Sequence, residues 1–419
     1  MSKKTPDIKA DKAGARSAIL IDRGETVGLM EPMRVSEGAR HYGPLADLAL
    51  ELAARSTGLR RSLPDGIGDA LAGLVRSMNC YYSNLIEGHD THPVDIERAL
   101  AGDYSTNAEK RSLQLEAKAH IQVQKWIDGL DSPASLCSAE GICELHRRFC
   151  ALLPDDLLWV EHPETGGREQ PVPGAFRTTD VQVGRHIPIS PGAVRRFLRR
   201  FEEAYAPLGK SAVIMATAAA HHRLLWIHPF ADGNGRVARL LSHAMLKGTV
   251  DTGGIWSVAR GLARNTATYK AYLAACDQPR RNDLDGRGTL SEEELAAFTG
   301  FFLETCIDQV NFMERLVEPK RLRDRIAAWA EEEIRAKTLP PRSLLVLDAI
   351  LYRGTLARGE VRDILGATDR TARRLTAALL KSGVLTAAST RAPLTLAFPA
   401  RLAPRFMPGL FPDIGYETE

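Results

Sequence analysis

The chain has 419 residues, 44% of them hydrophobic, so it can bury a large core and is expected to divide into two or three units. Its net charge of +3 excludes a protein that attracts nucleic acid through overall charge. The six cysteines form no CxxC pair and no apolar run reaches the about 18 residues of a membrane span, so we expect a cytoplasmic protein with reduced thiols and no membrane partner.

The first third of the chain is expected to be a loose tail at 1–20 followed by a helical region at 21–130. Apolar spacing predicts several amphipathic helices from about Leu45, including one over Asn107 to Asp128. An apolar stripe containing Tyr81 and Tyr82 predicts another helix that packs on a core and brings Glu87 to its end. An alternative is that Glu87 only ends this helix before a capping glycine, Gly88.

Residues 131–310 are expected to form the core. Helices are predicted over Ala139 to Leu153, Pro191 to Ala206 and Ser211 to Ile227. The last is almost wholly apolar, so we expect it at the centre of the core, with His228 at its end. His221 and His222 are neighbours and point about 100° apart on a helix, which favours interior histidines over zinc ligands.

Between these helices, the segment from Pro173 to Ile189 alternates apolar and polar residues on either side of Gly184. This pattern predicts a β-hairpin. The open edge of a hairpin can add a strand from another protein, with Val181, Gln182 and Val183 as the docking residues. An alternative is a surface hairpin with no role.

The stretch from His228 to Arg239 combines groups suited to phosphate chemistry. Gly233 and Gly235 flank Asn234, where backbone N–H groups can converge and a helix is predicted to begin, so its N-terminal dipole would face an anion. His228 is the only base of this stretch that is neutral at pH 7 and can take a proton from a hydroxyl.

Three charged side chains complete this stretch. Arg236 and Arg239 are three apart, so they project from one face of a helix and can bind the outer phosphates of a nucleotide. Asp232 precedes the glycines and offers a hard oxygen ligand to Mg²⁺.

A glycine-rich segment from Asp283 to Glu294 aligns in part with a calcium-binding EF-hand loop. Arg287 stands where such a loop needs an oxygen ligand, which argues against calcium. We instead expect a turn followed by a helix, with Ser291 as its N-cap and Glu294 as the capping partner.

The chain changes character after a connecting helix expected at 311–339. Residues 340–405 hold eleven basic and four acidic side chains, and the order of predicted elements resembles a winged helix-turn-helix. The predicted elements are a first helix from Arg342, a short helix at Gly359 to Leu365, a helix from Thr368 to Ser382, and strands at Val384 to Ala388 and Leu394 to Phe398. Residues 406–419 are expected to be a tail.

Three arginines near the start of the third of these helices, Arg370, Arg373 and Arg374, are candidate DNA contacts. An alternative is a winged helix that docks a protein or forms a dimer.

The stretch His228-Pro-Phe-Ala-Asp-Gly-Asn-Gly-Arg-Val-Ala-Arg239 resembles the signature of the Fic family, and every fixed position of that signature is matched. The resemblance implies a mainly α fold, a Fic helical core with a β-hairpin flap, and transfer of AMP from ATP, with Mg²⁺, to a Ser, Thr or Tyr hydroxyl of a target protein. His228 would be the general base and Asp232 the metal ligand. The residues that would bind the nucleotide are Phe230, Gly233, Asn234, Gly235, Arg236 and Arg239. The kinase-like Doc branch has a lysine at the position of Gly235.

The segment Ser83-Asn84-Leu85-Ile86-Glu87-Gly88 is similar to the inhibitory motif of many Fic proteins. The resemblance implies that Ser83, Glu87 and Gly88 form this motif and that Glu87 pairs with Arg239, which misaligns ATP. Similar hairpins in the family form a flap that docks the target.

Three alternatives remain open: a DNA-associated regulator with a nucleotide-sensing or silent site, a Fic enzyme that uses another nucleotide, and an enzyme that removes AMP. Self-modification and a homodimer are also compatible with the sequence.

Overall fold

The computed structural model describes residues 20–154, 157–161, 168–250 and 252–412. Within them the chain is mainly helical, with two small antiparallel sheets. The helices of the larger body are α1 (Tyr42–Arg61), α2 (Asp65–Ile86), α3 (Pro93–Leu100), α4 (Ala108–Asp128), α5 (Ala139–Cys150), α6 (Val194–Tyr205), α7 (Lys210–Ile227), α8 (Asn234–Lys247), α9 (Val258–Arg264), α10 (Thr266–Cys276) and α11 (Glu292–Val317). Short 3₁₀ helices lie at Val27–Met30, Pro133–Cys137, Pro191–Ala193 and Ala400–Leu402.

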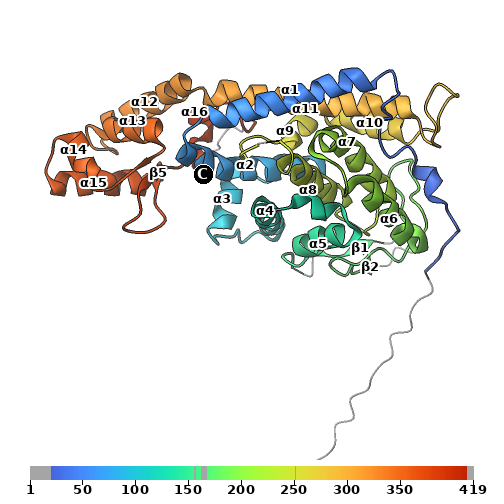
Figure 1. The fold of residues 1–419 in the computed structure, drawn as a ribbon. Coiled ribbons are helices and arrows are strands. Elements are labelled where there is room, and N and C mark those ends of the chain that lie inside the picture. The colour runs from blue at the N-terminus through green and yellow to red at the C-terminus, as the bar shows by residue number, and fades with distance from the viewer. Residues whose placement is uncertain (1–19, 155–156, 162–167, 251, 413–419) are drawn as a thin grey trace, which may run out of the picture.

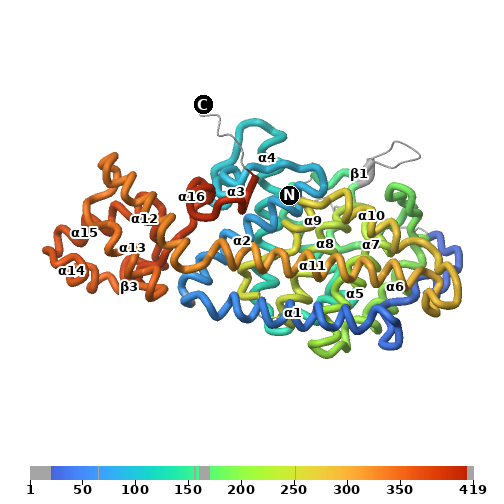
Figure 2. Tube along the Cα trace, turned by 90° about the horizontal axis from the view of Figure 1, so that it is seen from above, coloured from blue at the N-terminus to red at the C-terminus, as the bar shows by residue number. Residues whose placement is uncertain are grey.

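A smaller body follows α11 and lies at one end of the molecule (Figure 1). Its elements are α12 (Pro319–Arg335), α13 (Ser343–Arg353), β3 (Thr355–Leu356), α14 (Glu360–Leu365), α15 (Asp369–Lys381), β4 (Leu385–Thr386) and β5 (Leu394–Leu396), before α16 (Ala403–Phe406). The long helices α1 and α11 run side by side along the larger body, and α11 leads directly into α12 (Figure 2). None of the helices in the described parts of the chain is both long and apolar enough to cross a membrane.

Helix α7 lies at the centre of the larger body, as predicted from its apolar sequence. It is buried almost all round and contacts α1, α6, α8 and α11. His221 on this helix is an interior residue: its Nδ1 donates to the Ser242 hydroxyl (2.9 Å) and its Nε2 accepts from the Tyr269 hydroxyl (2.7 Å). His222 is also buried and contacts Asp277 through Nε2 at 3.0 Å. Both histidines therefore have protein partners.

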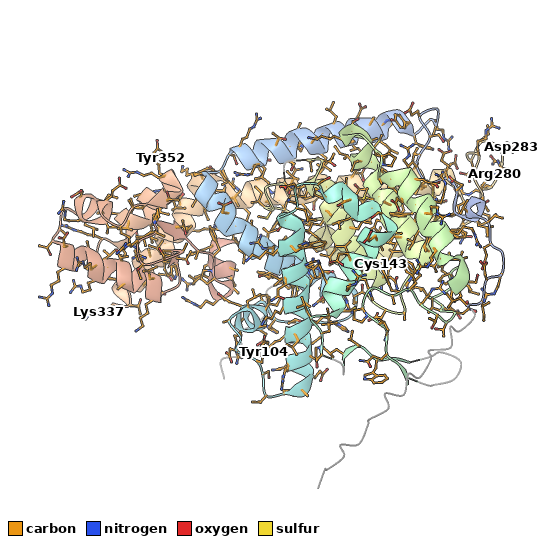
Figure 3. All side chains as sticks on the ribbon, turned by 60° about the horizontal axis from the view of Figure 1, so that its bottom comes forward. Tyr104, Cys143, Arg280, Asp283, Lys337 and Tyr352 are labelled. Atoms are coloured by element: carbon orange, nitrogen blue, oxygen red, sulfur yellow. The ribbon has the colours of Figure 1, made fainter. Side chains whose placement is uncertain are left out.

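Side-chain caps fix where several helices begin. The Asn107 side chain accepts from the backbone N–H of Lys110 at 3.0 Å, so α4 begins at Ala108. Ser291 caps α11 in the same way by accepting from the Glu294 N–H at 3.1 Å, which confirms Ser291 as the cap. The Ser291 N–H donates to the Gln278 carbonyl at 3.0 Å and the Glu294 carboxylate pairs with Arg281, so the expected capping by Glu294 was wrong. The loop before Ser291 lies at the end of the molecule opposite Tyr352 and Lys337, with Asp283 and Arg280 on its surface (Figure 3).

The hairpin predicted between Pro173 and Ile189 is present only as a tight turn, and this prediction was therefore wrong in its extent. Val183 and His186 form one bridge, with N···O distances of 2.9 and 3.0 Å, and the described residues of this segment form no longer ladder. The arms are held instead by the Arg177 side chain, which donates to the carbonyls of Thr179 and Ile189. The antiparallel pair that the structure does contain lies earlier, with β1 (Val160–Glu161) paired to β2 (Arg168–Glu169).

In the smaller body, the three strands form an antiparallel sheet in the order β3-β5-β4. Thr355 is opposite Thr395, and Leu385 is opposite Leu396. Strands β4 and β5 are shorter than predicted, and the two-residue strand β3 was not predicted because it is too short to show an alternating pattern.

Residues 406–412 were expected to begin a tail, but they pack against the larger body. The Leu410 carbonyl accepts from the Tyr82 hydroxyl at 3.1 Å, and the Phe411 ring lies 5.8 Å from the Tyr81 ring in an edge-on contact. At its other end α2 meets the smaller body, where a Cβ on Gly66 would lie 2.4 Å from the Gly354 carbonyl oxygen. Helix α2 is therefore held by the C-terminal part of the chain at two points.

Candidate active site

Helix α7 ends at Ile227 and is followed by His228, whose backbone is left-handed with φ 49° and ψ 61°. Few residues other than glycine adopt this conformation, so neighbouring contacts must hold it. Arg177 supplies them: its Nε donates to the His228 carbonyl at 2.8 Å and its backbone N–H donates to the Pro229 carbonyl at 2.9 Å. The backbone after α7 is thereby fixed in a sharp turn.

The imidazole of His228 is oriented as a neutral base. Its Nδ1 lies 3.3 Å from the Leu225 carbonyl, to which it can only donate, so Nε2 keeps its lone pair. Burial lowers the pKa of His228 to about 4. The ring is therefore uncharged at pH 7 and can accept a proton at Nε2.

Phe230 and Asn234 lock the loop after His228. The Phe230 ring is fully buried and stacks on His146, with ring centroids 3.9 Å apart and planes 5° apart. The Asn234 side chain accepts from the Phe230 N–H at 3.0 Å and donates to the Phe230 carbonyl at 2.9 Å. The amide of Asn234 thus shapes the loop, and only its backbone N–H is left for a ligand.

Helix α8 begins inside this loop and offers an anion site. Gly233 has φ 78°, which turns the chain into the helix, and the first bond within the helix runs from the Val237 N–H to the Gly233 carbonyl. The N–H groups of Asn234, Gly235 and Arg236 are therefore unpaired within the helix.

A carboxylate lies over this end of α8. A Cβ on Gly235 would fall 2.3 Å from Oε1 of Glu87. The N-terminal end of α8 therefore already faces a negative group, one that comes from the end of α2.

The predicted pair of Glu87 and Arg239 is present. Nη2 of Arg239 lies 2.5 Å from Oε1 of Glu87, and Nε of Arg239 donates to the Ser83 hydroxyl at 2.8 Å. Partial burial acts to raise the pKa of Glu87, but the charge and hydrogen bond of Arg239, together with the charges of Arg236 and His89, hold that pKa below its usual value. Gly88, with φ 90°, ends α2 directly after Glu87, so this segment contains both the glycine cap and the ion pair.

Arg236 has a partner that the sequence did not reveal. Its Nε lies 3.2 Å from Oε1 of Glu116 on α4, and its guanidinium lies 5.2 Å from the Phe149 ring centroid. The other oxygen of Glu116 accepts from Nδ1 of His89 at 2.8 Å. Glu116 on α4 and Glu87 at the end of α2 thus pair with the two arginines of α8.

Asp232 is exposed next to Gly233 and is the carboxylate within the loop. Its donor chemistry fits Mg²⁺, which typically takes one or two protein carboxylates together with phosphate oxygens and waters. Among the residues that the structure describes, no group of three or more metal-ligating side chains is found.

The residues of the predicted flap lie on the surface. Val183 is 44% exposed, and Nε2 of Gln182 donates to the Gly184 carbonyl at 2.9 Å, while Val181 is half-buried. His186, across the turn, contacts the Trp226 carbonyl through Nε2 at 2.8 Å. This bond ties the flap to the last turn of α7, just before His228.

Three residues of this site could not be found from the sequence: Arg177, His146 and Glu116. Each is a single residue in a segment with no motif, and each acts through a contact to a loop far away in the chain. Only the folded structure brings them to the loop.

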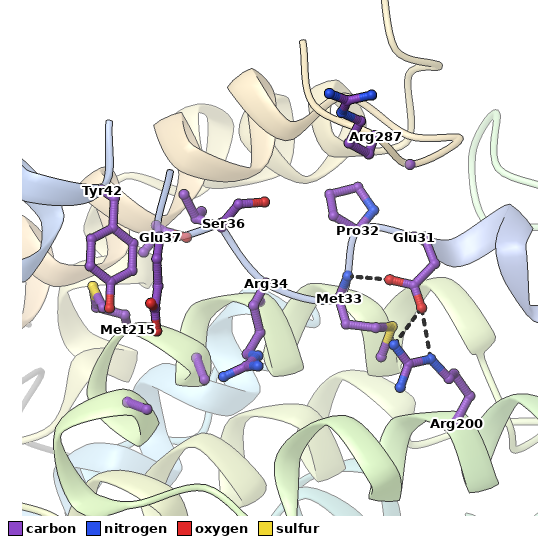
Figure 4. Close-up of a pocket in the computed structure, with 16 residues that line it drawn as sticks. Glu31, Pro32, Met33, Arg34, Ser36, Glu37, Tyr42, Arg200, Met215 and Arg287 are labelled. Atoms are coloured by element: carbon purple, nitrogen blue, oxygen red, sulfur yellow. Dashed lines mark hydrogen bonds and ion pairs between the residues drawn. The ribbon is translucent and has the colours of Figure 1, made fainter. Parts of the chain in front are cut away.

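A cavity of about 510 Å³ lies elsewhere, between α7 and residues 31–42 (Figure 4). Its lining includes Met215, Arg34 and Tyr42, together with Arg200, which pairs with Glu31 at 2.6 Å. It contains no residue of the stretch from His228 to Arg239, and its charges are mixed in sign. We therefore take the loop at the start of α8, and not this cavity, as the candidate active site.

Comparison with known proteins agrees with this choice. Residues 136–246 match the model of the Fic/DOC family. The protein adenylyltransferase Fic of Culex quinquefasciatus is 36% identical over 185 residues, which cover 42% of this chain and 34% of that protein. The protein adenylyltransferase Fic of Drosophila grimshawi is 32% identical over 196 residues, which cover 45% of this chain and 37% of that protein. The chain thus spans less than half the length of these relatives.

The fold is also shared with a solved structure. The crystal structure of a Fic family protein from Desulfovibrio desulfuricans G20 aligns with a TM-score of 0.50 and 15% sequence identity, covering 87% of this chain and 98% of that one. The family match identifies a Fic/DOC domain at residues 136–246, the relatives are similar to this chain in sequence, and the solved structure shares its fold.

Proposed function

We propose that the chain is a protein adenylyltransferase that moves AMP from ATP to a Ser, Thr or Tyr hydroxyl of a target protein. One observation supports this proposal most strongly: a neutral histidine, His228, and the anion-accepting end of α8 lie in a single loop, which the Asn234 side chain holds by hydrogen bonding to the backbone. The names of the relatives, protein adenylyltransferase Fic, support it.

In this proposal Nε2 of His228 takes the proton from the attacking hydroxyl. The hydroxyl oxygen attacks the α-phosphorus, a new P–O bond forms, and pyrophosphate leaves. The N–H groups at the start of α8 hold the inner phosphates, and Arg236 and Arg239 hold the outer ones. Asp232 would hold Mg²⁺, which when bound neutralises phosphate charge.

We further propose that Glu87 inhibits this reaction. Its carboxylate lies over Gly235 and occupies Arg239, the two groups that the outer phosphates need. If ATP binds while Glu87 stays in place, Arg239 is not free to bind its outer phosphates, and the Glu87 carboxylate repels them. The α-phosphate is then misaligned.

The surface turn with Val181, Gln182 and Val183 is the proposed docking site for the target. Exposed apolar side chains, Val183 at 44% and Ile187 at 71%, support this role, since an extended segment of another protein can pack on them.

Label transfer tests the chemistry. The Glu87→Gly variant is incubated with ATP labelled on either the α- or the γ-phosphate, with Mg²⁺ and a cell lysate, and label in both the lysate proteins and the chain itself is measured. The proposal expects only the α-label to be incorporated. Incorporation of the γ-label would show a kinase, and incorporation only from another nucleotide would show a different donor. Release of AMP from modified protein would show the reverse reaction.

A second candidate function is DNA-associated regulation through residues 340–405, which we propose form a winged helix-turn-helix domain. Arg370, Arg373 and Arg374 are all exposed in the first turns of α15, whose N-terminus Thr368 caps. Binding of duplex DNA that weakens with salt, and that the double variant Arg373→Ala, Arg374→Ala abolishes, would support it. Absence of binding at low salt would favour protein docking.

A further inference from the structure

We propose that Glu116 is the positioning residue of Arg236 and, through His89, the tether of the segment that carries Glu87. One buried carboxylate would then serve both the phosphate site and its inhibition. This inference rests on the proposed adenylyltransferase function and extends it to residues outside both sequence motifs.

The geometry supports a positioning role. Glu116 contacts Nε of Arg236, at the edge of the guanidinium, and this leaves the two terminal nitrogens for a phosphate. The side chains are 7% and 9% exposed, so each offsets part of the cost of burying the charge of the other. The Phe149 ring, 5.2 Å from the guanidinium, limits its movement on another side.

The side chains of Glu87 and Glu116 differ in how exposed they are, and this difference indicates different roles. The Glu87 side chain is 32% exposed and stands at the C-terminal end of α2, where a small movement of the chain can withdraw it. Glu116 is 7% exposed and lies in the middle of α4, among buried neighbours such as Ala117 and Ala119. A phosphate can therefore replace Glu87 beside Arg239, whereas Glu116 stays with Arg236 in both states.

His89 connects Glu116 to the inhibitory segment. It lies two residues after Glu87, its backbone N–H donates to the Asn84 carbonyl at 3.0 Å, and its Nδ1 donates to Oε2 of Glu116 at 2.8 Å. The C-terminal end of α2 is therefore bonded to α4 directly beyond Glu87. Loss of this bond should let Glu87 leave Arg239 more often.

The first test compares ATP with AMP, which lacks the outer phosphates. In the Glu87→Gly background, Glu116→Gln should raise the Kd for ATP about tenfold, or about 1.4 kcal/mol, and change the Kd for AMP by less than about twofold. A purely structural role would weaken both nucleotides equally. Glu109→Gln, at an exposed position on the same helix, is the matched control and should change neither. Equal effects on both nucleotides, or none on ATP, would overturn the inference.

A second pair of variants tests the same inference in other ways. Glu116→Asp keeps the charge but withdraws it from Arg236, so it should weaken ATP binding selectively even if Glu116→Gln fails to fold. His89→Ala, with Glu87 intact, should raise transfer of the α-label above wild type by about threefold. Unchanged transfer would overturn the tether. If Glu87→Gly binds ATP but transfers no AMP, the proposed function fails, while the comparison of ATP with AMP still decides the role of Glu116.

Discussion

At the scale of single residues, the proposed chemistry depends on a histidine that stays neutral. Burial lowers the pKa of His228 to about 4, below the usual value of about 6.5. Since the base must be unprotonated to act, its activity is present above this pKa and is lost as the pH falls through it. In the Glu87→Gly variant we expect the transfer rate to stay constant from neutral pH down to about pH 5 and to fall below that. A pH–rate profile that turns down near 6.5 would contradict this environment for His228.

Asn234 offers a second prediction at this scale. Its side chain makes both hydrogen bonds to the backbone of Phe230, so Asn234→Ala should free the loop and lower transfer by about tenfold or more, with a loss of about 1–2 kcal/mol in stability. Transfer and thermal unfolding are measured on the Glu87→Gly background. Asn282→Ala is the control, because Asn282 caps the Leu284 N–H in an exposed loop far from the site in the sequence. Equal activity of the two variants would show that the loop does not need Asn234.

The stretch from His228 to Arg239 could be recognised from the sequence because its groups are adjacent in the chain. The contact of Glu87 with Arg239 followed from the resemblance, and the structure contains it. Arg177 and Glu116 could not be found in this way, since a lone charged residue in an ordinary helix or loop has the same local pattern whether or not it meets a distant partner.

At the scale of secondary-structure elements, apolar periodicity predicted the helices well. The helix expected over Ser211 to Ile227 is Lys210–Ile227, and the one expected from Asn107 begins one residue later, after its cap. The hairpin predicted at Pro173 to Ile189 was too long. Alternation of apolar and polar residues reports which side chains face inward, but it does not report how the two arms pair, and here Arg177 donates to the Ile189 carbonyl.

The prediction for secondary-structure elements concerns the stability of variants in helix α2, because this helix contacts both bodies. Alanine is a better helix former than glycine by about 1 kcal/mol, yet Gly66→Ala should destabilise the protein by about 1–3 kcal/mol, since its Cβ would lie 2.4 Å from the Gly354 carbonyl oxygen. Gly58→Ala in α1, where nothing lies within 4 Å of the added Cβ, should instead stabilise it. These opposite effects on stability are tested by measuring the Tm of both variants. A higher Tm for Gly66→Ala would contradict the packing of α2 against the smaller body.

At the scale of the whole molecule, the larger body buries several uncharged histidines. Burial lowers the pKa of His120 and His221 to about 3 and of His146 and His222 to about 4. In the unfolded chain these groups take up protons near pH 6.5, so the stability they contribute is present above that pH and is lost as the pH falls. Each unit below 6.5 costs up to about 1.4 kcal/mol for each buried histidine.

We therefore expect the Tm to fall between pH 7 and pH 5, before the carboxylates protonate. His120→Leu should make the Tm less dependent on pH over this range, because it removes one of these histidines. His92→Gln, at an exposed position, is the control and should leave the dependence unchanged. A Tm that is constant or rises toward pH 5 would contradict the burial of neutral histidines in the core.

The arrangement of the whole molecule was the least predictable from the sequence. Composition and length indicated two or three units, but they did not reveal that residues 406–412 return to pack on Tyr81 and Tyr82. Such contacts join positions more than 300 residues apart, and no local pattern reports them.

The most direct test of the account measures incorporation of α-labelled ATP into protein by the wild type, Glu87→Gly, and the double variant Glu87→Gly, His228→Ala. We expect little incorporation by the wild type, strong incorporation by Glu87→Gly, and none by the double variant, because in the proposed mechanism Glu87 restrains a reaction that needs His228 as its base. Equal incorporation by the wild type and Glu87→Gly would contradict the inhibition, and labelling that survives the loss of His228 would contradict the proposed chemistry.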